Sequence, residues 1–346
     1  MSSEEPNHVI LIASDIHLGA FESNTAAFNA FLSKILDGGF GDHLKFLIIL
    51  GDFLDMMFDT PAAIEEKHQD IHLKLKRINQ QKNVELIYIL GNHEIPVNCN
   101  PFTGDLFDSF EKSKKEFIPK LSSIGILNDL FNSDNVCQDL ILKKDSEGNS
   151  ILVLYDSFEQ SLREIEANGI NLDDSYECLI THGYRFDGPK IKYFASIFWR
   201  TLIEASDQRA KDLADYFWNE LIRSKVGLAN ADYNVIKQRI PNLTESEYNT
   251  MRISMKLIEK FESKRDRFYY SDRIAEYLED EDNGLLSITS VIYGHSHEKQ
   301  DEMRKIHDRW VKIINSGAWQ HVTHPSYVTI DDTGEIHVFE FYEDIE

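Results

Sequence analysis

The sequence predicts an α/β fold in which a helical insertion interrupts a core built around a sheet. Two observations lead to this prediction. Residues 9–90 alternate between short apolar runs and stretches with helical spacing, and apolar runs return near the end of the chain after a long charged segment. Strands that alternate with helices are typical of a parallel sheet covered by helices.

Three buried strands are predicted in the N-terminal part of the chain. The runs Val9–Ser14, Leu44–Leu50 and Val84–Leu90 are short and almost continuously apolar, which is typical of strands covered on both faces. Between them, Thr25–Leu36 carries apolar residues at helical spacing and ends at an Asp-Gly-Gly stop signal. Ala62–Gln81 is also predicted to be a helix, so the order is strand, helix, strand, helix, strand.

Further strands are predicted on both sides of a charged, helix-like segment. We therefore expect a core of residues 1–187 and 286–346 and a helical insertion over residues 188–285. The last two strands flank an Asp-Asp-Thr-Gly sequence, which favours a hairpin turn. These later strands are Leu140–Leu142, Ile151–Tyr155, Tyr176–Thr181, Ile288–Tyr293, Trp310–Asn315, Tyr327–Ile330 and Ile336–Phe341.

The chain is strongly acidic, with 36 Lys and Arg against 59 Asp and Glu and a formal net charge of −23. This balance disfavours duplex nucleic acid as a partner, because such binding depends on clustered basic side chains that neutralise phosphates. A phosphate-containing substrate remains compatible with it, since bound metal ions supply local positive charge.

The cysteines and the apolar runs indicate the cellular compartment of the protein. Its three cysteines, Cys99, Cys137 and Cys178, form no Cys-x-x-Cys pair, which favours buried free thiols in a reducing compartment. The N-terminus lacks the pattern of a signal sequence, and no run approaches the roughly 20 apolar residues of a membrane-spanning helix. We expect a soluble, cytoplasmic protein without a membrane span.

Metal-binding residue types directly follow five of the predicted strands, and glycines next to them let the chain turn sharply there. Because ligands bind outside the carboxyl ends of strands in α/β sheets, these side chains are expected to converge on one edge. Within Asp-x-His and His-x-His, alternate residues point the same way if the backbone is extended. The candidates are Asp15, His17, Asp52, Asn92, His93, His182, His295 and His297.

The donor types indicate a pair of metal ions. Apart from His93, the set contains two Asp, one Asn and four His, which is enough for two metals about 3.5–4 Å apart that share a carboxylate and a water. Nitrogen and oxygen ligands without thiolates favour Mn, Fe, Zn or Co.

Five motifs, in this order, resemble the calcineurin-like metallophosphoesterase superfamily: Ser-Asp-x-His-Leu-Gly, Gly-Asp-x-x-Asp, Gly-Asn-His-Glu, a lone His-Gly and Gly-His-x-His. The resemblance covers roughly residues 9–182 and 288–340. It implies a four-layer αββα sandwich with two metal positions that share Asp52. The implied ligands are Asp15, His17, Asp52 and His297 for one metal, and Asp52, Asn92, His182 and His295 for the other.

The resemblance also implies hydrolysis of a phosphoester or pyrophosphate bond by a water that bridges the two metals. His93 would lie near the phosphate, where its imidazolium could protonate the leaving oxygen or hold a phosphate oxygen. Asp55 and Glu94 belong to the same motifs, and we interpret both as residues that orient ligands. The expected substrate is a phosphorylated small molecule or a nucleotide-like compound.

Several more specific interpretations remain open. The insertion lies at the same place in the chain as the helical lid of UDP-diacylglucosamine pyrophosphatases, so the layout resembles theirs. Those enzymes, however, commonly have Arg where this chain has His93. DNA nucleases of the Mre type share the ligand set, although their capping domain follows the last ligand. A catalytically silent scaffold of the same fold is the non-enzymatic alternative. The aromatic segment Tyr184–Arg200 is either a buried helix or a cap that contacts substrate.

Overall fold

The computed structural model describes residues 7–20, 23–55, 61–94, 129–157, 160–186, 269–280, 285–319 and 325–342. The chain divides into two compact units. One contains Met1–Pro96, Phe110–Arg185 and Ala275–Glu346, and the other contains Val97–Ser109 and Phe186–Ile274. Most of the predicted insertion over 188–285 lies outside the described residues, so that domain boundary stays a prediction, and the fold below is that of the first unit.

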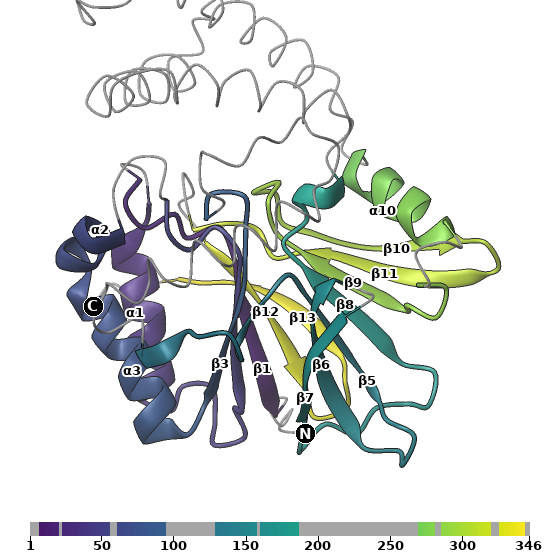
Figure 1. Ribbon diagram of the computed structural model, residues 1–346, viewed down its shortest axis with the longest axis horizontal. Helices are drawn as coiled ribbons and strands as arrows, with labels where there is room; N and C mark the ends of the chain where they lie inside the picture. Colours follow the sequence, from purple (N-terminus) through teal and green to yellow (C-terminus); the bar gives the residue numbers. More distant parts are fainter. Residues whose placement is uncertain are drawn as a thin grey trace, which may run out of the picture. The chain divides into compact units, whose positions relative to one another are not determined.

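The first sheet has six strands in the order β13-β12-β1-β2-β3-β4 (Figure 1). Strands β1 to β4 run parallel to one another, whereas β12 pairs antiparallel with both β1 and β13. The parallel arrangement predicted for the N-terminal strands is confirmed. The bounds are β1 (His8–Ala13), β2 (Phe46–Leu50), β3 (Glu85–Ile89), β4 (Val136–Cys137), β12 (Ser326–Asp331) and β13 (Ile336–Glu340).

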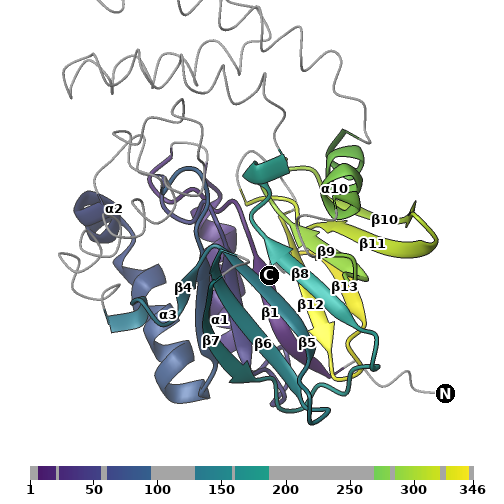
Figure 2. The same ribbon diagram turned by 45° about the vertical axis from the view of Figure 1, so that its right-hand side comes forward.

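The second sheet has seven strands in the order β10-β11-β9-β8-β5-β6-β7 (Figure 2). Strands β8, β9 and β11 are parallel, and the remaining pairs are antiparallel. Both sheets are therefore mixed, and the predicted α/β class is confirmed. The bounds are β5 (Asp139–Lys144), β6 (Ser150–Ser157), β7 (Gln160–Glu166), β8 (Glu177–Thr181), β9 (Ser290–Tyr293), β10 (Gln300–Ile306) and β11 (Arg309–Asn315).

Alternate residues of the first sheet pack into two different cores. In β2, Phe46, Ile48 and Leu50 join the apolar cluster shared with the second sheet. Leu47 and Ile49 point the other way, into the cluster formed with the helices. Because side chains of a strand alternate between the two faces of a sheet, a continuously apolar strand is stable only when both faces are covered.

Helices cover the outer face of the first sheet (Figures 1 and 2). Helix α1 (Thr25–Leu36) has the predicted bounds. It begins at Asn24, whose Oδ1 accepts a hydrogen bond from the backbone N–H of Ala27 at 3.2 Å, and this cap satisfies one of the free amides at the helix start. Helices α2 (Pro61–Lys67) and α3 (Gln69–Lys82) follow. Helix α10 (Tyr269–Glu279) comes later in the chain.

Four elements differ from the prediction. The single helix expected over Ala62–Gln81 is wrong, because the chain breaks at His68 into α2 and α3. Strands β4, β7 and β10 were not predicted from the sequence. Strand β4 has only two residues, while β7 and β10 are edge strands. In β10, part-buried and exposed residues alternate until Ile306, so the apolar run that marks the central strands is missing there.

Two smaller predictions concern the thiols and the membrane. Cys137 and Cys178 are buried free thiols, as expected, and Cys99 lies outside the described residues. In the part of the chain that the structure describes, no helix combines the length and the apolar character needed to cross a membrane.

His72 gives the fold a sensitivity to acid. This α3 residue is fully buried, and neither of its ring nitrogens has a hydrogen-bond partner among the described residues. Burial, and then the nearby His68, lower its pKa from 6.5 to about 4 against the opposing charge of Asp70. The unfolded chain therefore binds a proton more readily, so stability is complete above pH 6.5 and falls as the pH drops towards 4.

We expect His72→Leu to reduce the loss of unfolding free energy between about pH 7 and about pH 4.5 by about 2 kcal/mol. Urea denaturation of both proteins at the two pH values measures this difference. The same replacement at His43, which is exposed, is the control and should preserve the native pH dependence. An unchanged pH dependence in His72→Leu would contradict the role given to this side chain.

Candidate metal centre

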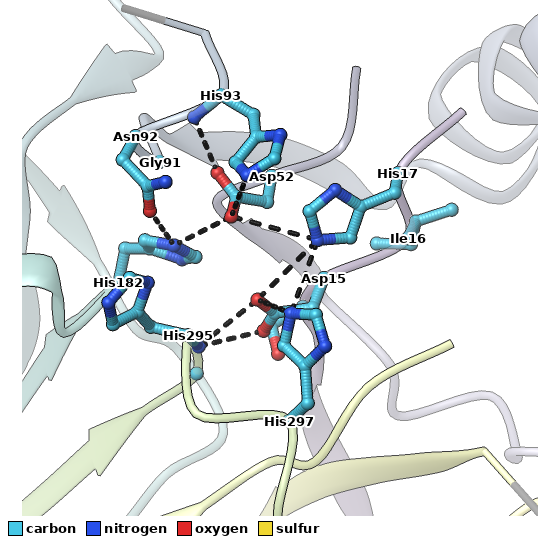
Figure 3. Close-up of polar contacts among 12 residues, drawn as sticks. Asp15, Ile16, His17, Asp52, Gly91, Asn92, His93, His182, His295 and His297 are labelled. Carbon is cyan, nitrogen blue, oxygen red and sulfur yellow. Dashed lines mark hydrogen bonds and ion pairs between the residues drawn. The ribbon is translucent and has the colours of Figure 1, made fainter. Parts of the chain in front are cut away.

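All eight candidate residues lie at the carboxyl ends of five strands, three from the first sheet and two from the second. The side chains face one another around a common centre (Figure 3). The convergence expected from the sequence is therefore observed. Asp15 and His17 follow β1, Asp52 follows β2, Asn92 and His93 follow β3, His182 follows β8, and His295 and His297 follow β9.

One group of potential ligands consists of Asp15, His17 and His297, whose ligand atoms all lie within 4.8 Å of one another. His297 Nε2 lies 3.2 Å from Asp15 Oδ1 and 3.3 Å from His17 Nε2. His17 Nδ1 lies 3.2 Å from Asp55 Oδ2, and a carboxylate can only accept, so Nδ1 carries the hydrogen. In the neutral ring, the lone pair of His17 Nε2 is then directed into this group.

A second group consists of Asp52, His182 and His295. His182 Nδ1 lies 2.9 Å from the carbonyl oxygen of Leu50, which again assigns the hydrogen to Nδ1. Its Nε2 lies 3.2 Å from Asp52 Oδ2 and 3.2 Å from Asn92 Oδ1. Burial would lower the pKa of His182, but the charge of Asp52 outweighs it and raises the pKa to about 10. Without a metal, the Nε2 proton is therefore shared with these oxygens, and a bound cation would replace it, held by the same three atoms.

Asp52 belongs to both halves of the site. Its Oδ2 lies 3.2 Å from His182 Nε2 and 3.7 Å from His17 Nε2, so it reaches a histidine of each group (Figure 3). Its Oδ1 accepts a hydrogen bond of 2.9 Å from the backbone N–H of His93. This placement suits the shared position that the resemblance implies. These two groups divide the histidines as that resemblance does, while a third group of His17, Asp52 and His93 overlaps them. The individual ligand roles stay predictions.

The backbone is strained at the same residues. Seven non-glycine residues of the described ranges have positive φ, a conformation that costs of order 1–3 kcal/mol each. The condition of an extended backbone in Asp-x-His and His-x-His is not met, because left-handed conformations are found at these residues. Five of the seven are candidate site residues: Asp15, His17, Asp52, His295 and His297.

Two glycines allow the chain to approach the site closely. A Cβ atom at Gly51, where φ is +73°, would lie 2.2 Å from His182 Nδ1. A Cβ atom at Gly91 would lie 2.2 Å from Asp52 Oδ1 and 2.3 Å from Asp52 N. Any side chain at either position would displace a potential ligand, which is the physical reason for glycine before Asp52 and before Asn92.

Electrostatic coupling keeps the buried carboxylates charged. Burial alone would raise the pKa of Asp15, but the hydrogen bond and charge of His297 outweigh it and lower the pKa to about 2. For Asp52, the charges of His182 and His93 likewise overcome burial and hold the pKa well below its usual range. Two buried anions at the centre of the site favour a cation between them.

Asp55 connects His93 to His17. Its Oδ2 lies 3.1 Å from His93 Nδ1 and 3.2 Å from His17 Nδ1. Burial would lower the pKa of His93, but the charges of Asp55 and Asp52 outweigh this effect and raise it to about 9. The side chain of His93 is 13% exposed. Asp55 therefore favours the protonated form of His93 and contacts its ring, which is partly exposed.

Some groups that hold the site residues in place could not be identified from the sequence. The Leu50 carbonyl orients His182, and the hydroxyl of Tyr88 donates a 2.7 Å hydrogen bond to Glu94. Both residues belong to apolar runs that mark strands. The backbone N–H of Trp319 donates to the carbonyl oxygen of Asp15 at 3.1 Å. A motif pattern identifies side chains with donor chemistry, whereas these contacts depend on tertiary packing.

Two further features lie apart from this centre. Asp331, Glu335 and His337 form another group with possible ligand atoms, but Asp331 already accepts hydrogen bonds from the backbone of Thr333 and Glu335 in the β12–β13 turn. A cavity of about 610 Å³ is lined by residues such as Lys45 and Asn83 and by none of the eight candidates. Neither feature contributes to the metal centre.

The family follows from a comparison with known protein families. A model described as calcineurin-like phosphoesterase matches residues 8–299. The chain belongs to this family. A search among curated proteins found no match.

The fold was also compared with solved structures. A dimetal phosphatase from Danio rerio shares 11% identity at a TM-score of 0.36, covering 98% of this chain and 100% of that one. A hypothetical protein from Pyrococcus horikoshii shares 13% at a TM-score of 0.35, covering 97% and 88%. A predicted phosphoesterase from Streptococcus pneumoniae shares 10% at a TM-score of 0.28, covering 96% and 97%. The family assignment rests on the family model.

We expect Gly91→Ala to weaken binding of Mn²⁺ by roughly 10–100-fold, because the new methyl group displaces Asp52. Isothermal titration calorimetry measures the affinity. Gly148→Ala is the matched control. Its φ is +88°, and no described atom lies within 4 Å of the added Cβ, so the change costs about 1–2 kcal/mol of stability without touching the site. Equal Mn²⁺ affinity in the two variants would contradict the close approach of Gly91 to Asp52.

Proposed function

We propose that this phosphoesterase is a dinuclear metal-dependent hydrolase that cleaves a phosphoester or pyrophosphate bond. The observation that carries the proposal is the convergence of imidazole nitrogens with carboxylate and amide oxygens around Asp52. The substrate we propose is a phosphorylated small molecule or a nucleotide-like compound, and the metals are drawn from Mn, Fe, Zn and Co. The buried thiols fit a reducing location, and we propose the cytoplasm.

The proposed roles of the site residues are of two kinds, binding of the metal ions and transfer of a proton. When bound, two divalent cations would activate a water and stabilise the negative charge that develops on the phosphoryl group. Asp15, His17 and His297 would hold one of them, and Asn92, His182 and His295 the other, with Asp52 shared. The left-handed backbone at several of these residues orients them before substrate arrives, which limits the reorganisation needed during reaction.

His93 is the candidate proton donor. Asp55 engages its Nδ1, while Nε2 lies 4.0 Å from the shared Asp52. An imidazolium so placed could donate the Nε2 proton to the oxygen of the departing group, or a hydrogen bond to a phosphate oxygen. Partial exposure of this ring, beside buried metal-binding candidates, leaves it accessible from the solvent side.

Other members of the fold remain alternatives that experiment separates. A DNA nuclease of the Mre type would use the same ligands, and a catalytically silent scaffold would keep the fold without turnover. The resemblance to UDP-diacylglucosamine pyrophosphatases gains no support from the comparisons, so a nucleotide-sugar pyrophosphate is one substrate among several to be tried. The net charge of −23 favours a small substrate over a long nucleic acid.

We expect hydrolysis that depends on added Mn²⁺ and stops with a chelator. The assay is a parallel screen of phosphate monoesters, phosphodiesters, nucleotide diphosphate sugars and single-stranded DNA, with Asp52→Asn as the inactive reference. Cleavage of a small ester or pyrophosphate supports the proposal, and cleavage of DNA alone supports the nuclease. Neither bound metal nor hydrolysis of any substrate would favour the scaffold.

We expect His93→Ala to retain its metals but to lose roughly 10²–10⁴-fold in kcat on substrates with poor leaving groups. The loss should be smaller with a nitrophenyl leaving group, which departs without protonation. Kinetics on the two substrate types, with metal analysis of the same preparation, measure both effects. The control is His43→Ala, which changes an exposed histidine outside the site. If His93→Ala hydrolyses an alkyl phosphate ester at the native rate, His93 is not the proton donor.

A further inference from the structure

Glu94 is a fully buried carboxylate that accepts four hydrogen bonds. Its Oε2 accepts from the backbone N–H of Asp52 at 3.1 Å and of Gly91 at 2.8 Å. Its Oε1 accepts from the backbone N–H of Leu54 at 3.0 Å and from the hydroxyl of Tyr88 at 2.7 Å. None of these four donors is charged, and their hydrogen bonds offset part of the cost of burying the carboxylate.

These bonds join two neighbouring loops of the site. Asp52 and Leu54 lie in the loop after β2, while Gly91 lies at the end of β3. From the same turn, the backbone N–H of His93 donates to Asp52 Oδ1. Asp52 is therefore held twice: Glu94 binds its backbone, and the amide of His93 binds one carboxylate oxygen.

The consequence concerns the remaining oxygen of Asp52. With the backbone and Oδ1 both held, Oδ2 is directed between His182 and His17, at 3.2 Å and 3.7 Å from their Nε2 atoms. Asn92 belongs to the turn that is held by the hydrogen bonds of Glu94. The position of Asn92 next to His182 therefore depends on these hydrogen bonds. Gly91 has no Cβ to resist the approach, and the Glu94 hydrogen bonds keep the two loops together.

We propose that Glu94, supported by Tyr88, is a positioning residue that sets the separation of the two metal positions by clamping the Asp52 loop to the Gly91–Glu94 turn. It contacts backbone amides and a tyrosine hydroxyl and acts on the metals only through Asp52 and Asn92. The inference rests on the proposed dinuclear centre.

The chemistry of the four donors makes two substitutions informative together. In Glu94→Gln, the amide NH₂ must replace one oxygen and would meet backbone N–H groups that cannot accept a hydrogen bond. It is best tolerated in place of Oε1, because the hydroxyl of Tyr88 can rotate and accept from it. Tyr88→Phe removes the hydroxyl that would accept this hydrogen bond. The double variant therefore has no acceptor for the NH₂ group, and its loss should exceed the product of the single losses.

The test uses the full-length protein with Mn²⁺ as the only probe. Equilibrium dialysis with metal analysis gives the number and affinity of bound ions, and electron paramagnetic resonance reports the exchange coupling between two Mn²⁺ ions. We expect two coupled ions in the native protein. Glu94→Gln should bind the weaker ion roughly 10-fold less tightly, and the double variant roughly 100-fold or more, with altered coupling at saturating Mn²⁺.

Asp145→Asn is the matched control. Asp145 also accepts backbone hydrogen bonds in a turn, from Glu147 at 2.8 Å and Asn149 at 2.9 Å, but between β5 and β6. It should keep native affinity and coupling. Two ions bound natively by the Glu94 variants, with only a lower melting temperature, would overturn the positioning role and leave the proposed function intact. A native protein that binds no Mn²⁺ would overturn both.

Discussion

The site depends on one constraint, the meeting of strand ends from two different sheets. Asp15, Asp52 and Asn92 follow strands of the six-stranded sheet, whereas His182 and His295 follow strands of the seven-stranded sheet. The apolar cluster between the sheets sets how these edges face each other. Because close packing resists small displacements, the interior of the sandwich positions ligand atoms that lie at its rim.

The stability of this packing offsets an unfavourable local structure. Strained backbone conformations and buried carboxylates are concentrated within the same few residues. Each would destabilise an isolated loop. The surrounding strands and the hydrogen bonds of Glu94, Asp55 and the Leu50 carbonyl hold the arrangement. Such local conflict between stability and geometry is typical of functional sites.

Prediction from the sequence succeeded where the signal is local. The central strands are continuous apolar runs, helix α1 has apolar residues at helical spacing before an Asp-Gly-Gly stop, and the polar motifs directly follow strands. It failed for β7 and β10, because an edge strand needs no continuous apolar run. The break at His68 between α2 and α3 was missed because apolar spacing continues across it. The condition of an extended backbone around His17 and His297 is not met, since φ depends on how the loops pack.

The sequence by itself determined the α/β class and the donor chemistry, since both depend on residue types within short stretches of chain. Tertiary structure decided the distances at which the donors meet: His295 lies with Asp52 and His182, while His297, two residues later, lies with Asp15 and His17, the division that the resemblance implies. It also placed Tyr88 beneath Glu94. These contacts join residues from different strands, and their distances follow from the packing of two sheets, which no local pattern encodes.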